Sequence, residues 1–112
     1  MTEKKYLVPP IDIYETDDKY IILADMPGAT KDGIEISVEN DTLVITGKVP
    51  EPDKNWKLVE SEFTMNDYRR DIRIGNKVNR EKIDARYENG VLTLELAKSE
   101  QAKPRKIKVN VA

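Results

Sequence analysis

Short segments of alternating apolar and polar residues, each followed by a turn signal, constrain this chain more than any other feature. Segment 33–38 alternates without exception, and segment 42–46 follows it directly after Asn40-Asp41. Alternation with a period of two is typical of a half-buried β-strand. The strand-like segments are 10–14, 20–24, 33–38, 42–46, 68–74, 82–87 and 91–96. Short strands separated by turns at this density predict an antiparallel β-sandwich of roughly 7–9 strands.

Two glycine-containing pairs define the sharpest turns. Pro27-Gly28 suits the central positions of a type II turn, and Asn89-Gly90 suits the type I′ turn of a two-residue hairpin. The second turn would join segments 82–87 and 91–96. Residue propensity also leaves open a helix over REKIDARYEN. We rank the helix second, because Asn89-Gly90 stands directly before an obvious strand.

Cysteine and histidine are both absent from the sequence. Their absence excludes disulfides, thiol nucleophiles, Cys/His zinc sites and histidine-dependent triads. The acidic cluster Asp12, Glu15, Asp17 and Asp18 lacks the regular spacing of a calcium loop. The chain has 21 acidic residues, so almost any carboxylate pair could be nominated as an acid–base couple. We therefore expect no enzyme, no cofactor and no metal site.

Charge and hydropathy limit the classes of partner. The formal net charge is −2, whereas nucleic acids and anionic membranes are bound by a basic excess. No apolar run approaches the roughly 20 residues of a membrane span. The start of the chain, MTEKKYLVPP, lacks the apolar core of a signal peptide. We expect a single cytoplasmic domain that binds neither nucleic acid nor membrane.

A long connection, residues 49–67, does not fit a simple sandwich. It carries Trp56 and Phe63, the only tryptophan and the only phenylalanine of the chain, together with Leu58. Side chains of this size need apolar cover, either on the same subunit or on another.

The C-terminal run RKIKVNVA is the second exception. Ile107, Val109 and Val111 alternate with polar residues, after a polar tether that could extend on the order of 30 Å. On the residues alone, a final strand of the chain's own sheet is the favoured interpretation. Docking on a neighbouring molecule is the alternative.

Four runs together resemble the α-crystallin domain of the bacterial-type small heat-shock proteins. They are ADMPGATKDGIEISVENDTLVITGK, YRRDIRI, ARYENGVLTLELAK and PRKIKV, and the resemblance covers about Pro10 to Val109. It implies an immunoglobulin-like β-sandwich over 10–98, a short N-terminal segment over 1–9 and a flexible C-terminal extension over 99–112. The implied function is that of an ATP-independent holdase, which binds partly unfolded client proteins and limits their aggregation.

The resemblance also assigns sites. The 49–67 loop would exchange between subunits of a homodimer, with its apolar residues and the arginine of the following strand at the interface. The tail would dock in a groove of a neighbouring subunit and build a higher oligomer. The implied interface residues are Trp56, Leu58, Phe63 and Arg70; the groove residues for tail or client are Ile34, Ile36, Val38, Ile83, Ala85 and Tyr87; the tail anchors are Ile107 and Val109.

Alternation supports a covered position for Arg70, because it places this residue on the same strand face as Tyr68 and Ile72. A covered guanidinium needs a carboxylate or carbonyl partner, and we expect that partner at a subunit interface. One more exposed charge in a basic run is the alternative.

The sequence departs from the family pattern chiefly at its start. Only nine residues precede Pro10, where family members carry a longer apolar segment, so we expect weak activity alone or co-assembly with a longer small heat-shock relative. A co-chaperone adaptor of the CS-domain type is the alternative function, but such domains lack the long loop and the Ile-x-Val tail. A carbohydrate-binding sandwich would need a row of exposed aromatic residues.

Overall fold

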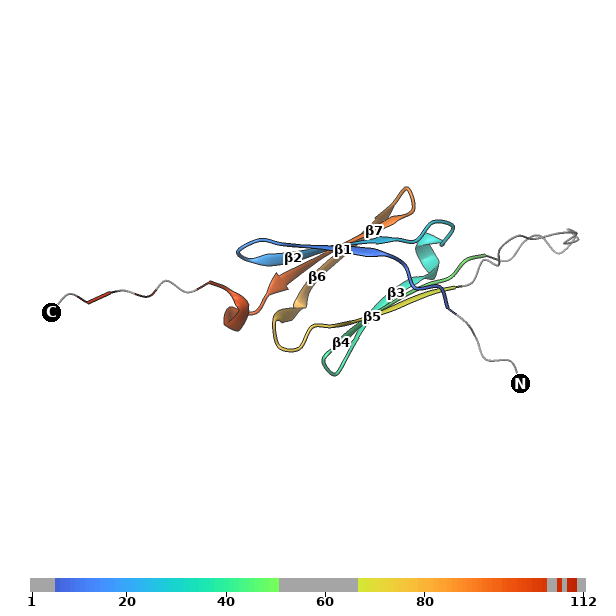
Figure 1. The fold of residues 1–112 in the computed structure, drawn as a ribbon. Coiled ribbons are helices and arrows are strands. Elements are labelled where there is room, and N and C mark those ends of the chain that lie inside the picture. Colours follow the sequence, from blue (N-terminus) through green and yellow to red (C-terminus); the bar gives the residue numbers. More distant parts are fainter. Residues whose placement is uncertain (1–5, 51–66, 105–106, 108, 111–112) are drawn as a thin grey trace, which may run out of the picture.

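The computed structural model describes residues 6–50, 67–104, 107 and 109–110. In these ranges the chain forms a sandwich of two antiparallel sheets (Figure 1), which confirms the predicted fold class. One sheet has the order β1-β2-β7-β6 and the other β3-β4-β5. The elements are β1 (Ile11–Glu15), β2 (Lys19–Asp25), η1 (Lys31–Gly33), β3 (Ile34–Glu39), β4 (Thr42–Gly47), β5 (Tyr68–Arg73), β6 (Val78–Glu88), β7 (Val91–Lys98) and η2 (Glu100–Ala102).

Both predicted glycine turns are present. Asn89 and Gly90 have φ values of 52° and 80°, as a type I′ hairpin requires. Gly28 has φ 85°, and the Ala29 N–H donates to the Met26 carbonyl at 3.3 Å, as in a type II turn. The helix considered over 80–89 is wrong, because this segment lies in β6.

The core is built from the inward-facing residues of both sheets. Ile22 of β2, Leu43 and Ile45 of β4, and Leu92 and Leu94 of β7 are at most 1% exposed. Alternation puts them all between the sheets, while their neighbours along each strand point outward. Full burial contributes about 1.5–3 kcal/mol for each side chain of this size, so the face-to-face packing dominates the stability.

The N-terminal residues join the sandwich earlier than the sequence suggested. Leu7 forms a parallel bridge with Tyr68: its N–H donates to the Asp67 carbonyl at 2.8 Å and its carbonyl accepts from the Arg69 N–H at 3.0 Å. Pro9 is buried, and the chain then crosses from the edge of β5 to β1. This contact is absent from the sequence analysis, which begins the domain at Pro10.

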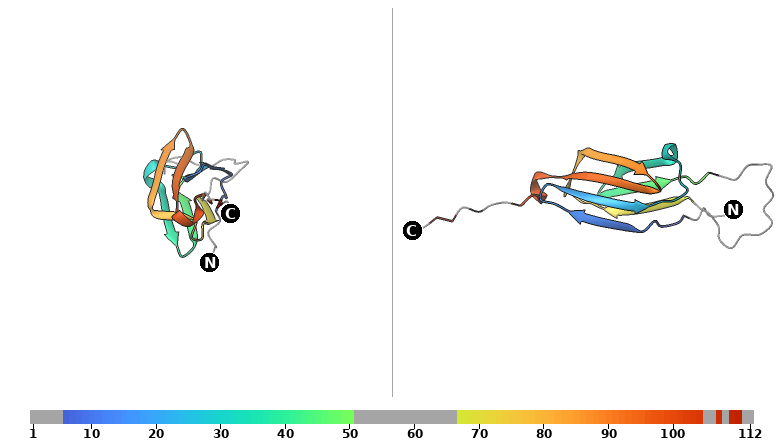
Figure 2. Two further views of the ribbon diagram at one scale, coloured as in Figure 1. Left: turned by 90° about the vertical axis from the view of Figure 1, so that its left-hand side faces the viewer. Right: turned by 90° about the horizontal axis from the view of Figure 1, so that it is seen from above.

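The arrangement leaves two open sides. The edge strands are β1 and β6 in one sheet and β3 and β5 in the other. Figure 2 shows the sandwich along its length, with β6 near β3 on one side and β1 near β5 on the other. Each side therefore combines strand edges with access to the core, although Leu7 pairs with part of the β5 edge.

An ion pair ties β1 to the end of β7. Lys98 is 5% exposed, and its Nζ lies 2.9 Å from Glu15 Oε1 and 5.1 Å from the centre of the Tyr20 ring. The hydrogen bond and charge of Lys98 lower the pKa of the Glu15 carboxyl below its ordinary value. The carboxylate in turn supplies the partner that a buried ammonium needs.

We predict that Glu15→Gln lowers the free energy of unfolding at pH 7. Because the pKa of Glu15 is lower in the folded state, its stabilising contribution is complete above the unfolded-state pKa of about 4.3 and is lost as the pH falls through the folded-state pKa. Urea denaturation from pH 7 to pH 2 should therefore show wild type and variant converging in acid. Glu81→Gln, at an exposed residue, is the matched control. A difference that stays constant down to pH 2 would contradict the assignment.

Candidate functional site

The open side between β3 and β6 is the candidate site. It holds a cavity of about 380 Å³. Because β3 and β6 are each the last strand of a sheet, their outer backbone groups are available to a visiting strand. The cavity is lined by Lys31, Ile34, Ile36, Ala85, Arg86, Tyr87, Glu88 and Leu92.

The floor of this groove is apolar and its rim is charged. Ile34 and Ile36 are half-buried, Leu92 is 1% exposed, and the small Ala85 leaves the centre open. The Tyr87 hydroxyl is satisfied inside the protein, because it donates its one hydrogen to the Met26 carbonyl at 2.8 Å, with the Ala29 carbonyl as a second acceptor within reach at 3.2 Å. The groove therefore suits aliphatic side chains of an extended peptide, and its lining contains no nucleophile with an activating base.

A second tyrosine holds the same loop from the opposite sheet. The Tyr68 hydroxyl donates to the Pro27 carbonyl at 2.6 Å, and burial raises the pKa of this phenol. The Pro27-Gly28 turn is thus tied to both sheets. It fixes the position of the segment that leads into η1 and β3.

Four of the six predicted groove residues line this one cavity: Ile34, Ile36, Ala85 and Tyr87. Val38 and Ile83 are half-buried on the same two strands but do not line it. The other lining residues, Lys31, Arg86, Glu88 and Leu92, were not predicted from the sequence. Leu92 could have been found from its place opposite Tyr87 in the predicted hairpin. Which charged residues form the rim depends on the order of the strands in the two sheets. Alternation of residues along the sequence does not reveal that order.

The described residues of the tail add no strand to the chain's own sheet. Ile107 and Val109 are 87% and 80% exposed and belong to no strand. The interpretation favoured on the residues alone is therefore wrong for these two positions. Their aliphatic side chains have no apolar cover within the described part of the chain.

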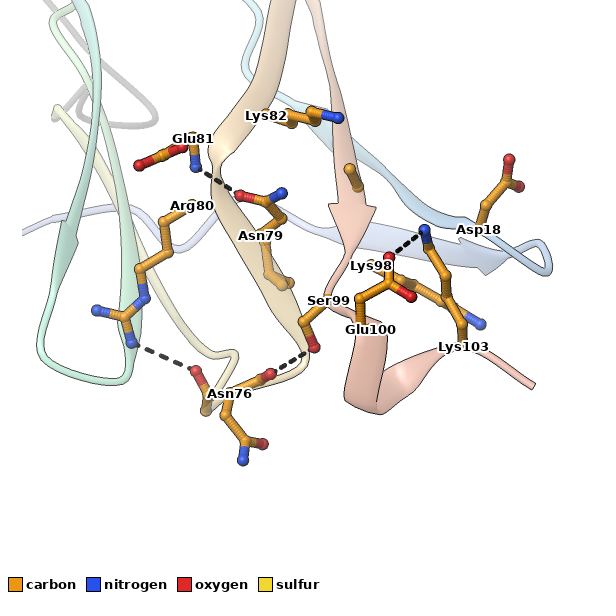
Figure 3. A pocket seen from close by; sticks show the side chains of 13 residues that line it. Asp18, Asn76, Asn79, Arg80, Glu81, Lys82, Lys98, Ser99, Glu100 and Lys103 are labelled. Carbon is orange, nitrogen blue, oxygen red and sulfur yellow. Dashed lines mark hydrogen bonds and ion pairs between the residues drawn. The ribbon is translucent and has the colours of Figure 1, made fainter. Parts of the chain in front are cut away.

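The root of the tail is anchored next to a polar pocket at the η2 end of the sandwich (Figure 3). The Ser99 hydroxyl donates to the Asn76 carbonyl at 2.6 Å, and the Ser99 N–H donates to the Lys77 carbonyl at 2.9 Å. The Asn76 side-chain amide donates to Gln101 at 2.7 Å. η1 lies at the opposite end of the sandwich (Figure 1), so the anchored root and the Lys31 end of the groove are far apart along the molecule.

Arg70 is half-buried on the inner side of β5, as alternation predicted. Its Nη1 donates to the Pro9 carbonyl at 3.4 Å, and it forms no ion pair with a carboxylate among the described residues. One long hydrogen bond leaves most of its guanidinium donors without an acceptor in the part of the chain that the structure describes. The other predicted interface residues, Trp56, Leu58 and Phe63, lie outside the described residues.

The second open side, between β1 and β5, holds a smaller cavity of about 160 Å³. Ile13 at its mouth is 52% exposed. The only charged residues of its lining are Arg73 and Lys77; the others are Ile13, Tyr20, Ile22, Ile72, Ile74, Val78 and Leu96.

The described residues form neither a metal-binding cluster nor a membrane-spanning helix. Within 6–50, 67–104, 107 and 109–110, no group of three or more acidic residues is placed to hold a metal ion. No helix in the same ranges is long and apolar enough to span a membrane.

Comparison with known proteins gives a consistent assignment. A family model described as Hsp20/alpha crystallin family matches residues 12–111. The small heat shock protein C2 of Rickettsia felis is 36% identical over 110 residues, which cover 95% of this chain and 70% of that protein. Heat shock protein 16.0 of Schizosaccharomyces pombe superposes with a TM-score of 0.72 at 26% identity, over 95% of this chain and 99% of that one.

A further solved structure shares the fold. A small heat-shock protein of Xylella fastidiosa, described as having a distinct high order structure, superposes with a TM-score of 0.73. The identity is 24%, over 96% of this chain and all of the other.

Proposed function

The chain belongs to the Hsp20/alpha crystallin family of small heat shock proteins, and on this basis we propose that it is an ATP-independent holdase for partly unfolded proteins. The observation that carries the proposal is the β3/β6 groove, in which an apolar floor lies between two unpaired strand edges. A CS-domain adaptor is disfavoured by the family match, which extends through the tail to residue 111.

The proposed mechanism is binding without chemistry. An extended client segment pairs its backbone with the edge of β3 or β6 and places alternate apolar side chains in the groove. Each buried aliphatic side chain contributes about 1.5–3 kcal/mol before the cost of ordering the segment. Contacts of this size are individually weak and reversible, so release needs no nucleotide.

We further propose a homodimer formed by exchange of the 49–67 loop, with Trp56, Leu58 and Phe63 covered by the partner. Arg70 supports this part of the proposal. A half-buried guanidinium with a single long hydrogen bond at 3.4 Å is incompletely satisfied by the described residues of one subunit. A carboxylate or carbonyl from a second subunit would complete it.

We propose that, in assemblies larger than the dimer, the tail of one subunit docks on another subunit. Five extended residues, from Ala102 to Ile107, span at most about 17 Å. Leu92, in the groove floor, lies about 20 Å along β7 from Lys98, next to the anchored root. For Ile107 to dock at the Leu92 end of its own chain's groove, the anchored segment at Ser99 would have to detach from the sandwich. This requirement favours docking of the tail on another copy of the chain. The high order structure of the Xylella fastidiosa protein is consistent with such assembly.

Holdase activity is tested by light scattering of a heat-aggregating enzyme without ATP. We expect suppression at one dimer per client molecule and no further effect when ATP is added. Ala85→Arg, which fills the groove at an exposed position, should weaken suppression. Asp84→Asn makes the same change in net charge on the opposite face of β6 and is the matched control. Absence of suppression at equimolar dimer would reject the proposed function.

Arg70→Ala should raise the dimer dissociation constant by about tenfold or more, because it removes one side of a covered charged contact. Sedimentation velocity over a dilution series measures this constant. Arg73→Ala, at an exposed position of the same strand, should leave it unchanged. Equal dimer affinity in wild type and Arg70→Ala would place Arg70 outside the interface.

The double substitution Ile107→Gly, Val109→Gly should remove species larger than the dimer and leave the fold intact, because both side chains are exposed in the single chain. Multi-angle light scattering gives the native mass, and circular dichroism checks the fold. Asn110→Gly adds similar chain freedom without removing an apolar side chain. A native mass that does not change would exclude the tail as the assembly element.

A further inference from the structure

Apolar contact alone does not explain why a tail would choose the β3/β6 side. The lining of the β1/β5 cavity has six aliphatic side chains, whereas that of the β3/β6 groove has four, together with the charged Lys31, Arg86 and Glu88. Both sides also have strand edges, although Leu7 already bridges the β5 edge at Tyr68. Besides this cover and the difference in cavity volume, charge distinguishes the two sides.

The outer face of the three-stranded sheet carries opposite charges at its two edges. β3 presents Glu35 and Glu39, both exposed and in no ion pair within the described residues. The pairing register then runs through uncharged threonines to arginines on β5: Glu35 opposite Thr46 opposite Arg69, and Glu39 opposite Thr42 opposite Arg73. Asp71 offsets Arg69 at 3.2 Å, but Lys77 adds a further cation at the β5 side.

The tail carries a matching pattern. Lys106 and Lys108 alternate with Ile107 and Val109. In an extended strand these two pairs point to opposite faces. When Ile107 and Val109 enter the groove beside Ile34 and Ile36, the lysines lie on the outer face, where β3 carries its glutamates.

The two open sides therefore present different charges to an incoming tail strand. Along β3, one lysine lies opposite a glutamate and the other opposite Ser37, with a glutamate on each diagonal. Along β5, one lysine would lie opposite Arg69 or Arg73 and the other opposite Asp71, which is already paired with Arg69, and Lys77 would lie nearby. Like charges in directly opposed positions of a sheet are destabilising.

We propose that Glu35 and Glu39 select the tail: they direct the basic Ile-x-Val strand of another copy to the β3/β6 groove and away from the more apolar β1/β5 side. This inference rests on the proposed docking of the tail. It adds the residues that determine which side is used, and it makes assembly dependent on ionic strength.

Peptide titration tests the proposal. The receptor is the full chain with Ile107→Gly and Val109→Gly, so that its own tail does not compete. The probe is a fluorescently labelled peptide of residues 99–112, and anisotropy gives its Kd. Adding Glu35→Gln and Glu39→Gln to the receptor should weaken binding about 4- to 25-fold, from about two- to fivefold for each lost cross-strand pair. The affinity of the receptor with both glutamates should fall with added salt, and that of the Gln variant should fall less.

Three controls separate charge selection from other effects. Asp17→Asn with Glu81→Gln makes the same change in net charge at exposed sites outside the groove and should leave Kd unchanged. A peptide with Lys106→Glu and Lys108→Glu should bind poorly to the unaltered groove. The same peptide should regain affinity for a receptor with Glu35→Lys and Glu39→Lys.

The outcomes distinguish this inference from the function on which it rests. If Ala85→Arg abolishes peptide binding but the Glu35→Gln, Glu39→Gln receptor binds as before, charge selection is rejected and tail docking stands. If the peptide binds no receptor, or binds equally well with Ala85→Arg, docking in the β3/β6 groove is rejected and the selection with it. Recovery of affinity in the charge-swapped pair supports both.

Discussion

Burial of aliphatic side chains between two short sheets is the interaction on which the rest of this structure depends. Ile22, Leu43, Ile45, Leu92 and Leu94 are almost completely removed from water. They are contributed by β2, β4 and β7, which lie at interior positions of their sheets. With so few strands in each layer, the remaining four strands are all edges, and a core this small cannot be enclosed without leaving two sides open.

The exposed strand edges of the two open sides are a risk for aggregation, and they are also a surface on which another segment can bind. Unpaired strand edges usually promote aggregation, and proteins protect them with charges, bulges or covering segments. Here the β1/β5 side is partly covered by Leu7 and Pro9, and β6 is irregular between Val78 and Ile83. The β3/β6 side keeps an apolar floor with a charged rim. Such a surface suits a chaperone, because it accepts extended apolar segments without demanding one sequence.

Polar contacts decide where the groove and the tail lie. Tyr87 and Tyr68 hold the loop before β3 from opposite sheets, and this fixes the groove end near η1. Ser99 is anchored at the other end of the sandwich, so the tail leaves from there. The separation of groove and tail within one chain follows from these short hydrogen bonds, which link residues distant in sequence. This separation is consistent with the proposed docking of the tail on another copy.

Local pattern in the sequence determined the strands, the hairpins and the inward or outward direction of each side chain, since these depend on neighbouring residues. Arg70 was placed on the inner face of β5, and Asn89-Gly90 at its turn, for this reason. Only the tertiary structure decided which strands are edges, because pairing between distant segments depends on how the two sheets bury their common face. It thereby brought Ile34 and Ile36 to Ala85 and Tyr87, joined Leu7 to β5, and left Ile107 and Val109 uncovered. The glutamates of β3 and the arginines of β5 are present in the sequence. They form a charge gradient across one face because β4 lies between these two strands in the sheet.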